Sequence, residues 1–303
     1  MDEQDQALLE LGRFLRQQRY AFTTVTPETH RRNNARARPA RSLRDAFGWS
    51  RAFEAGLVPD ALLHRLQHTG WVVPAGARYQ PTVRFSTLGD GLYAHSPYPT
   101  VDEAAVFFGP DTYRFCTLLA ARIDRAQRCV DVGCGSGAGA LSLASRVDRL
   151  VLADINPQAV RFARVNAELA GVTDRVELVT GDLFAPVAGD LDLVIANPPY
   201  LLDDGHRIYR DGGGSAGEGL AVRIVREGLA RLVSGGRLVL YTGAAIVDGH
   251  DVVRAALVPV FEAAGARWSY EELDPDVFGE ELDAPAYAAV ERIAVVAAVA
   301  TAC

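Results

Sequence analysis

The sequence predicts an α/β protein with a doubly wound sheet and a smaller N-terminal helical domain that ends in a β-hairpin. Three observations support this prediction. From residue 128 on, short apolar runs alternate with Ala- and Leu-rich segments, the order typical of a parallel sheet covered by helices. A Gly-rich turn follows the first apolar run, and acidic or amide side chains follow the next ones. In a doubly wound sheet such positions share one edge, where ligands bind.

The chain of 303 residues is long enough for two domains, which we expect over residues 1–100 and 101–303. In the first domain, leucines recur at helical spacing near the N-terminus, and Ser42 and Asp60 are the expected N-caps of two further helices. A Gly-Asp-Gly turn then separates two short alternating segments, as in a hairpin. The predicted elements are helices over 7–19, 42–53 and 60–68 and strands over 79–85 and 92–95.

The second domain reads as alternating strands and helices. Pro157 suits the first turn of a helix, and Gly171 suits a position just after a helix end. The predicted strands cover residues 128–132, 150–153, 176–180, 191–196, 237–242 and 289–300, and the predicted helices cover 138–145, 157–170, 219–233 and 251–264.

A Gly-rich turn led by an acid follows the first strand of this domain. Asp131 precedes Gly133, Gly135, Gly137 and Gly139, and Cys134 stands where a small side chain fits. Glycines allow positive φ and let the backbone approach a ligand closely. The pattern is a compact variant of the dinucleotide-binding turn, and because no Lys-Ser/Thr follows, a P-loop is excluded.

Two further strand ends carry acids beside apolar residues. Asp154, with Ile155 next to it, follows the second strand, and its carboxylate can accept hydrogen bonds from both hydroxyls of a ribose. Asp182 and Leu183 follow the third strand, where an acid and an apolar residue can flank an adenine ring. Each acid taken singly is more often a solvated strand-end residue. Their shared register at one sheet edge favours a nucleoside site.

The fourth strand runs directly into Asn197-Pro198-Pro199-Tyr200. Two prolines fix a stiff turn, because neither can continue a strand ladder. The Asn197 amide oxygen and the Pro198 carbonyl can accept both hydrogens of one planar NH2 group, and the Tyr200 ring can stack on its plane. The alternative reading is a proline-terminated loop with a capping Asn.

These motifs resemble the class I S-adenosylmethionine-dependent methyltransferases, and most of all the N-methyltransferases that carry the Asn-Pro-Pro-Tyr tetrapeptide. The nearest subgroup is the release-factor glutamine methyltransferases. The resemblance covers residues 106–245 and rests on Asp131–Gly137, Gly181–Phe184 and Asn197–Tyr200, with Phe108–Thr112 and Tyr209–Gly213 as weaker matches. Tyr113 replaces the usual Glu, and neither the first third of the chain nor Asp274–Glu281 has a counterpart in that subgroup.

The resemblance implies a Rossmann-like sheet of seven strands and S-adenosyl-L-methionine as the cofactor. It implies no metal. Asn197, Pro198 and Tyr200 would be catalytic, and with Pro199 they would bind the substrate. The residues implied to bind the cofactor are Asp131, Gly133, Cys134, Gly135, Gly137, Asp154, Ile155, Asp182, Leu183 and Asn197.

The expected reaction is methyl transfer to a planar amide or amine nitrogen, with a protein glutamine side chain as the first candidate acceptor. The alternatives are a small metabolite and an rRNA or DNA base. A non-enzymatic scaffold that binds S-adenosylmethionine is a further alternative. The N-terminal domain would either recognise the substrate or cap the active site. The sequence leaves the oligomeric state open.

Charge is distributed unevenly. Residues 1–100 hold 13 arginines against nine acids, whereas residues 101–303 hold 18 against 29. The basic run from His30 to Arg41 could meet phosphates, but such runs are more often solvated faces, so nucleic acid is a less expected partner than a protein or small molecule.

The remaining features point to a cytoplasmic protein that does not enter a membrane. No apolar run is long enough for a membrane span, and the acidic N-terminus does not resemble a signal peptide. The four cysteines show neither metal-type nor disulfide-type spacing. His95, which opens the linker to the second domain, is expected to be a structural hydrogen-bonding residue.

Overall fold

The computed structural model describes residues 1–36, 39–100, 102–202 and 210–303. They form two compact units that interleave along the chain. The N-terminal unit comprises Met1–Arg114, Gly135–Ala138 and Gln158–Asp174, and the sheet unit comprises Phe115–Cys134, Gly139–Pro157 and Arg175–Cys303. A domain boundary near residue 100 stays a prediction.

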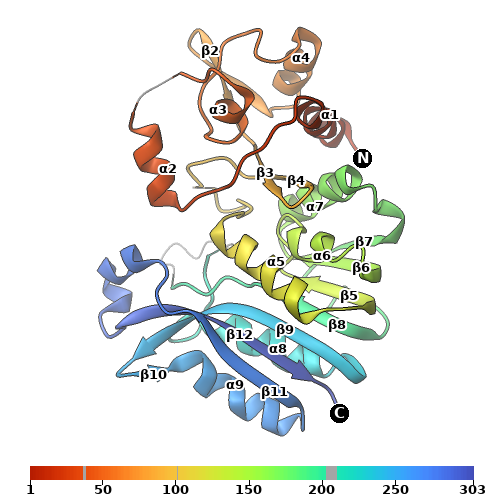
Figure 1. The fold of residues 1–303 in the computed structure, drawn as a ribbon, viewed down its shortest axis with the longest axis vertical. Coiled ribbons are helices and arrows are strands. Elements are labelled where there is room, and N and C mark those ends of the chain that lie inside the picture. Colours follow the sequence, from red (N-terminus) through yellow and green to blue (C-terminus); the bar gives the residue numbers. More distant parts are fainter. Residues whose placement is uncertain (37–38, 101, 203–209) are drawn as a thin grey trace. The chain divides into compact units, whose positions relative to one another are not determined.

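The N-terminal unit contains several helices and two short hairpins (Figure 1). Its core consists largely of leucine and aromatic side chains. Leu8, Leu11 and Leu15 are all fully buried, as their helical spacing predicts. Phe162 and Val165 of α7 belong to the same core, although they lie far along the chain. The helices are α1 (Glu3–Gln17), α2 (Pro27–Asn34), α3 (Leu43–Phe47), α4 (Asp60–His68) and α7 (Pro157–Ala170), and α5 (Pro110–Arg122) leads out of this unit.

Three details of the predicted helices differ from the structure. The helix expected over 42–53 is only α3, with Gly48 as its C-cap. Gly48 lies so close to Phe22 that a Cβ there would be 2.4 Å from Cδ2, which leaves no room for a larger residue. The Ser42 cap is confirmed, since its side chain accepts the Asp45 N–H. Asp60 is the first residue of α4 and not its N-cap, a position that Pro59 occupies. Helix α2 was not predicted.

Two hairpins replace the single predicted one. They are β1 (Val72–Ala75) with β2 (Arg78–Pro81) and β3 (Arg84–Leu88) with β4 (Gly91–His95). The strand expected over 79–85 is therefore two strands, divided after Pro81, which has no N–H to continue a ladder. The turn between Leu88 and Gly91 is confirmed.

The sheet unit contains the seven-stranded order β11-β12-β9-β8-β5-β6-β7, with the short β10 paired to β9. Pairing is parallel from β9 through β8, β5 and β6 to β7, and β12 runs antiparallel between β9 and β11. The strands are β5 (Ala126–Val132), β6 (Val147–Asp154), β7 (Val176–Thr180), β8 (Leu191–Ala196), β9 (Leu232–Val247), β10 (His250–Asp251), β11 (Arg267–Asp274) and β12 (Arg292–Thr301). The predicted Rossmann-like sheet is confirmed, with seven strands in its main order and β10 as an added eighth strand.

Helices lie on both faces of this sheet. Leu238 and Leu240 of β9 share a buried core with side chains of α8 (Gly219–Leu229) and α9 (Val252–Ala263). Side chains alternate between the two faces along a strand, so Tyr241 points to the opposite face from Leu240. Its ring packs on Phe115 of α5, with ring centroids 6.0 Å apart. The short helix α6 (Ala138–Ser142) follows the Gly-rich turn.

Some predicted bounds in this unit were wrong. The helix expected over 219–233 ends at Leu229, because Leu232 already begins β9. Strand β11 was not predicted. Its sequence contains several charged residues and lacks a regular alternation of apolar and polar residues, and in the structure most of its side chains are partly or fully exposed. Within the described ranges, no helix combines the length and the apolar character needed to cross a lipid bilayer.

Candidate functional site

The strand register brings three of the predicted site positions into one row. Val132 of β5 pairs with Ala153 of β6 on one side and with Ala196 of β8 on the other. The next residues are Gly133, Asp154 and Asn197, all at the carboxyl edge of the sheet. Neighbouring strands lie about 4.8 Å apart, so Asp154 and Asn197 are separated by about 10 Å along this edge.

The Gly-rich turn is anchored to the neighbouring strand at its start. The N–H groups of Gly133 and Cys134 both donate to the Ala153 carbonyl, at 2.9 and 3.1 Å. Gly133, Gly135 and Gly137 have φ of +70°, +54° and +79°, the left-handed region that the sequence analysis assigned to them. Cys134 is buried, and burial raises the pKa of its thiol well above the usual range. The turn therefore exposes backbone and not a reactive sulfur.

Asp131 is a buried carboxyl beneath this turn. Only 2% of it is exposed, and Oδ2 accepts the Ala140 N–H at 2.9 Å. Gly139 makes this contact possible, because a Cβ there would lie 2.8 Å from Oδ2. The pKa of Asp131 is raised to about 7, mainly by burial and to a smaller extent by the nearby charge of Asp154, while the hydrogen bond from Ala140 lowers it. Gly139 belongs to the predicted Gly-rich turn, but its close approach to Asp131 was not predicted.

Asp154 and Ile155 offer a polar acceptor beside an apolar surface. The Asp154 Oδ1 accepts the Asn156 N–H at 2.9 Å, which fixes the side chain at the strand end. Asp154 is 9% exposed, whereas Ile155 is 54% exposed. An exposed isoleucine next to a fixed carboxylate suits a ring system that carries hydroxyl groups.

Asp182 and Leu183 follow β7 in an unusual backbone conformation. The Gly181 N–H donates to the Asp154 carbonyl at 3.0 Å, which links this turn to the end of β6. Leu183 has φ of +46°. Asp182 forms an ion pair with Arg223 of α8 at 2.9 Å, with both side chains about half exposed. Exposed pairs of this kind contribute little to stability, so a ligand donor could replace Arg223 at low cost.

The Asn197 carboxamide is half-buried, and Pro198 is buried. In the described ranges, neither the Asn197 side chain nor the Pro198 carbonyl takes part in a hydrogen bond. A half-buried amide without a protein partner normally meets water or a ligand.

Tyr200 is buried against the backbone of β9. A Cβ at Gly243 would lie 2.1 Å from Tyr200 Cδ2, so the ring fits only because Gly243 has no side chain. The Phe278 ring stands edge-on to it with centroids 6.1 Å apart, and Phe278 itself has φ of +55°. Sequence reasoning missed both partners. A glycine in the middle of an apolar strand was the available signal for Gly243.

The segment between β11 and β12 packs on the residues that follow Tyr200. The Leu202 N–H donates to the Tyr287 hydroxyl at 2.7 Å, and Arg210 forms an ion pair with Glu281. The part of the chain without a counterpart in the resembled subgroup therefore borders the Asn-Pro-Pro-Tyr turn. Of the weaker match Tyr209–Gly213, Tyr209 lies outside the described residues.

Two further sequence features have a structural explanation. His95 is fully buried, its Nε2 lies 2.8 Å from Ser86 Oγ and its Nδ1 3.1 Å from the Ser96 carbonyl, which fits the expected structural role. In the basic run, Arg31 and Arg32 both pair with Glu28 and are mostly exposed, while Arg38 lies outside the described residues.

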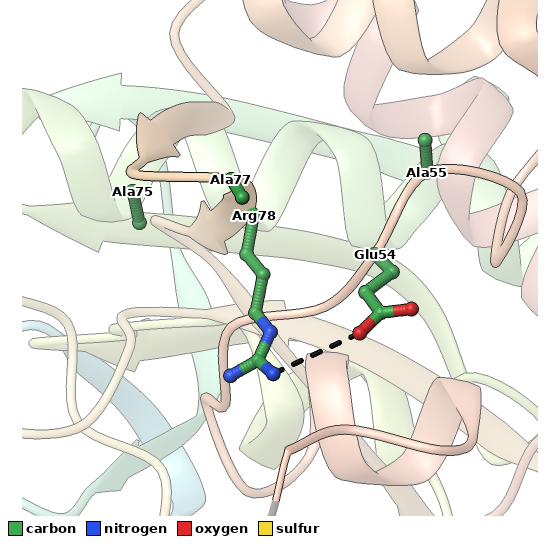
Figure 2. A pocket seen from close by; sticks show the side chains of 5 residues that line it. All are labelled: Glu54, Ala55, Ala75, Ala77 and Arg78. Atoms are coloured by element: carbon green, nitrogen blue, oxygen red, sulfur yellow. Dashed lines mark ion pairs between the residues drawn. The ribbon is translucent and has the colours of Figure 1, made fainter.

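Figure 2 shows a hollow in the N-terminal unit that contains no predicted site residue. Three alanines line it together with Glu54 and Arg78, which form an ion pair at 3.7 Å. No group of three or more His, Cys, Asp or Glu side chains among the described residues could hold a metal ion.

Comparisons with known proteins agree with the motifs. Residues 101–256 match the family model described as the methyltransferase small domain. The release factor glutamine methyltransferase of Deinococcus radiodurans is 34% identical over 196 residues, which are 60% of this chain and 66% of that protein. The ribosomal RNA small subunit methyltransferase C of Chromohalobacter salexigens is 36% identical over 118 residues, 39% of this chain and 32% of that protein. The chain thus spans less than two thirds of either relative.

A solved structure supports the fold. The crystal structure of wild-type Trm5b from Pyrococcus abyssi aligns with a TM-score of 0.53 and 14% identity, over 76% of this chain and 61% of that one.

The raised pKa of Asp131 predicts a pH-dependent stability. Between the unfolded pKa of about 3.9 and the folded value of about 7, the folded protein binds more protons than the unfolded chain. The Asp131 contribution is therefore largest below about pH 4 and is lost as pH rises to 7, by at most about 1.4 kcal/mol per pH unit. The free energy of unfolding is measured by urea for the wild type and for Asp131→Asn at pH 5, 6, 7 and 8. The difference between the two proteins gives the Asp131 contribution, because the effects of the other titrating groups cancel. A pH-independent difference would contradict the prediction.

Proposed function

The chain belongs to the methyltransferase small domain family, and from that premise we propose that it binds S-adenosylmethionine and methylates a planar amide or amine nitrogen held at Asn197. The observation that carries this proposal is the Asn197 carboxamide. It is half-buried, makes no hydrogen bond to a described residue and stands in the same row as Gly133 and Asp154. An acceptor nitrogen and a nucleoside-type cofactor could thus be held along one sheet edge.

The residues at this edge fit the proposed cofactor. Asp154 would accept hydrogen bonds from the ribose hydroxyls, and Ile155 and Leu183 would flank the adenine ring. Asp182 would accept from the adenine amino group in exchange for Arg223. When bound, S-adenosylmethionine supplies a methyl group already activated by its sulfonium, so the protein contributes mainly positioning.

Asn197 and Pro198 would hold the acceptor nitrogen through both of its hydrogens. Their two oxygens orient the lone pair for in-line attack, and the Tyr200 ring, held by Gly243 and Phe278, borders the site. Transfer would put the methyl group in place of one N–H hydrogen of the acceptor, and that proton would leave to solvent. As positive charge develops on the nitrogen, both oxygens bind its hydrogens more strongly, which lowers the barrier.

We propose a protein glutamine side chain as the acceptor. The likeness to a release factor glutamine methyltransferase supports this choice, and a release factor is the first protein to test. The likeness to a ribosomal RNA methyltransferase supports a second candidate, because a base amino group presents the same planar NH2. Incubating the protein with cell lysate and radiolabelled cofactor, then separating protein, RNA and small molecules, distinguishes these acceptors. No label in any fraction would favour a binding scaffold.

A cytoplasmic location completes the proposal. None of the four cysteines forms a disulfide with a described residue, and three of them are buried.

Cofactor identity is tested by calorimetry. S-adenosylmethionine and S-adenosylhomocysteine should bind, and NAD should not. Asp154→Ala should weaken binding by about 1.5–3 kcal/mol, because a charged acceptor of buried hydrogen bonds is lost. Asp148→Ala is the matched control, since Asp148 lies on the same strand, is 54% exposed and pairs with Arg125. Preferential NAD binding, or equal effects of the two variants, would refute the assignment.

The role of Asn197 is tested by turnover with the identified acceptor. Asn197→Ala should lower kcat by about 100- to 1,000-fold, the usual cost of losing one positioned group that stabilises developing charge. Asn197→Asp keeps an acceptor oxygen and should retain partial activity. Cofactor affinity should change less than kcat in both variants. Turnover of Asn197→Ala at the parental rate would rule out the hydrogen-bonding mechanism.

Gly243 provides a test of the Tyr200 position. Gly243→Ala places a methyl group where the ring lies, so the ring must move and kcat should fall by at least about tenfold, since small displacements of positioning groups cost this much or more. Tyr200→Phe keeps the ring in place and should retain most activity. Parental kcat in Gly243→Ala would show that the Tyr200 ring does not border the reacting nitrogen.

A further inference from the structure

Asn166 is a buried polar residue in the middle of α7 that the proposed mechanism does not use. It is 1% exposed, and its side chain makes three hydrogen bonds to backbone groups. Oδ1 accepts the Ala94 N–H at 2.7 Å, and Nδ2 donates to the Ala94 carbonyl at 3.0 Å and to the Ser136 carbonyl at 2.8 Å. Both amide hydrogens are thereby used.

The orientation of this carboxamide is fixed by its partners. Reversing oxygen and nitrogen would place the NH2 group against the Ala94 N–H, donor against donor. In its present orientation the side chain pairs with Ala94 of β4 as a neighbouring strand would. Its second hydrogen reaches Ser136, between Gly135 and Gly137 of the predicted cofactor turn.

Val106 lies close to the same turn. Val106 Cγ1 lies 3.8 Å from where a Cβ of Gly135 would be. The Val106 N–H donates to Ser96 Oγ at 2.8 Å, and the Ser96 N–H donates to the Val106 carbonyl at 3.2 Å. Because Ser96 directly follows β4, these two hydrogen bonds place Val106, which lies beside Gly135, next to the end of this strand.

The burial of these groups makes the linkage strong. Ala94 is fully buried, and Ser136 is 3% exposed. Without the Asn166 side chain, the Ala94 and Ser136 backbone groups would be left without partners in a region that water reaches poorly. Unpaired buried groups are costly, so the turn would move toward solvent instead of remaining in place.

We propose that Asn166 is a positioning residue that fixes the cofactor turn to the β3–β4 hairpin, so that cofactor binding and hairpin stability are coupled. The inference rests on the proposed function, since it takes the turn at Ser136 to contact the cofactor. Such coupling is reciprocal. A ligand that orders the turn stabilises the hairpin, and a change that destabilises the hairpin lowers the affinity for the ligand.

The first test uses the wild-type full chain and S-adenosylhomocysteine. Saturation with this ligand should slow hydrogen exchange of the β4 amides, including Ala94, by roughly 5- to 150-fold, the usual range of coupling between two sites. A purely structural Asn166 would leave these rates unchanged.

Variants then assign the coupling to Asn166. Asn166→Leu removes all three hydrogen bonds, whereas Asn166→Asp keeps the acceptor for the Ala94 N–H and loses the donors to the Ala94 and Ser136 carbonyls. Both should weaken S-adenosylhomocysteine binding by about 10- to 100-fold and abolish the ligand-dependent protection of β4. Val165→Ala is the matched control, because it opens a cavity next to Asn166 in the same helix without removing a polar contact. It should change affinity less than about threefold.

The outcomes separate this inference from the proposed function. A wild type that does not bind S-adenosylhomocysteine overturns both. Binding without added protection of β4, or equal loss of affinity in Val165→Ala and the Asn166 variants, overturns the inference alone. Should Asn166→Leu fail to fold, the wild-type exchange rates and Asn166→Asp still decide.

Discussion

The register of β5 between β6 and β8 is the constraint on which the candidate site depends. Because Val132 pairs with both Ala153 and Ala196, the three residues that follow these positions share one row at the carboxyl edge. Parallel pairing is held by backbone hydrogen bonds and by a core buried on both faces, so a slip of one residue would turn every side chain to the wrong face. Register thus brings together residues that lie as far apart in the sequence as Gly133 and Asn197.

A buried carboxyl group and two glycines that allow close packing lie near this row of residues. Asp131 is kept beneath the Gly-rich turn at the cost of a raised pKa, and Gly139 and Gly243 leave room for Asp131 and for the Tyr200 ring. Such features destabilise the empty protein or restrict its sequence, and they gather where ligands bind. Their position along the predicted cofactor and acceptor sites is consistent with the proposed methyl transfer.

Local signals predicted much of this arrangement, and long-range packing determined the rest. The bounds of β7, β8 and α7 follow from an apolar run or a Pro–Gly pair, and the acid-led glycines predicted the turn. The contacts of Tyr200 with Phe278 and of Asn166 with Ser136 join distant segments, and no local pattern encodes them. A proline inside an alternating run also ends β2 earlier than predicted.

The central claim is that the protein transfers methyl groups to a planar nitrogen. Incubation with cell lysate and cofactor that carries a ¹³C-labelled methyl group, followed by NMR and mass spectrometry of the labelled product, identifies the methylated atom directly. The account predicts label on an amide or amine nitrogen that carried two hydrogens. Label on oxygen, sulfur or carbon, with none on nitrogen, would contradict it.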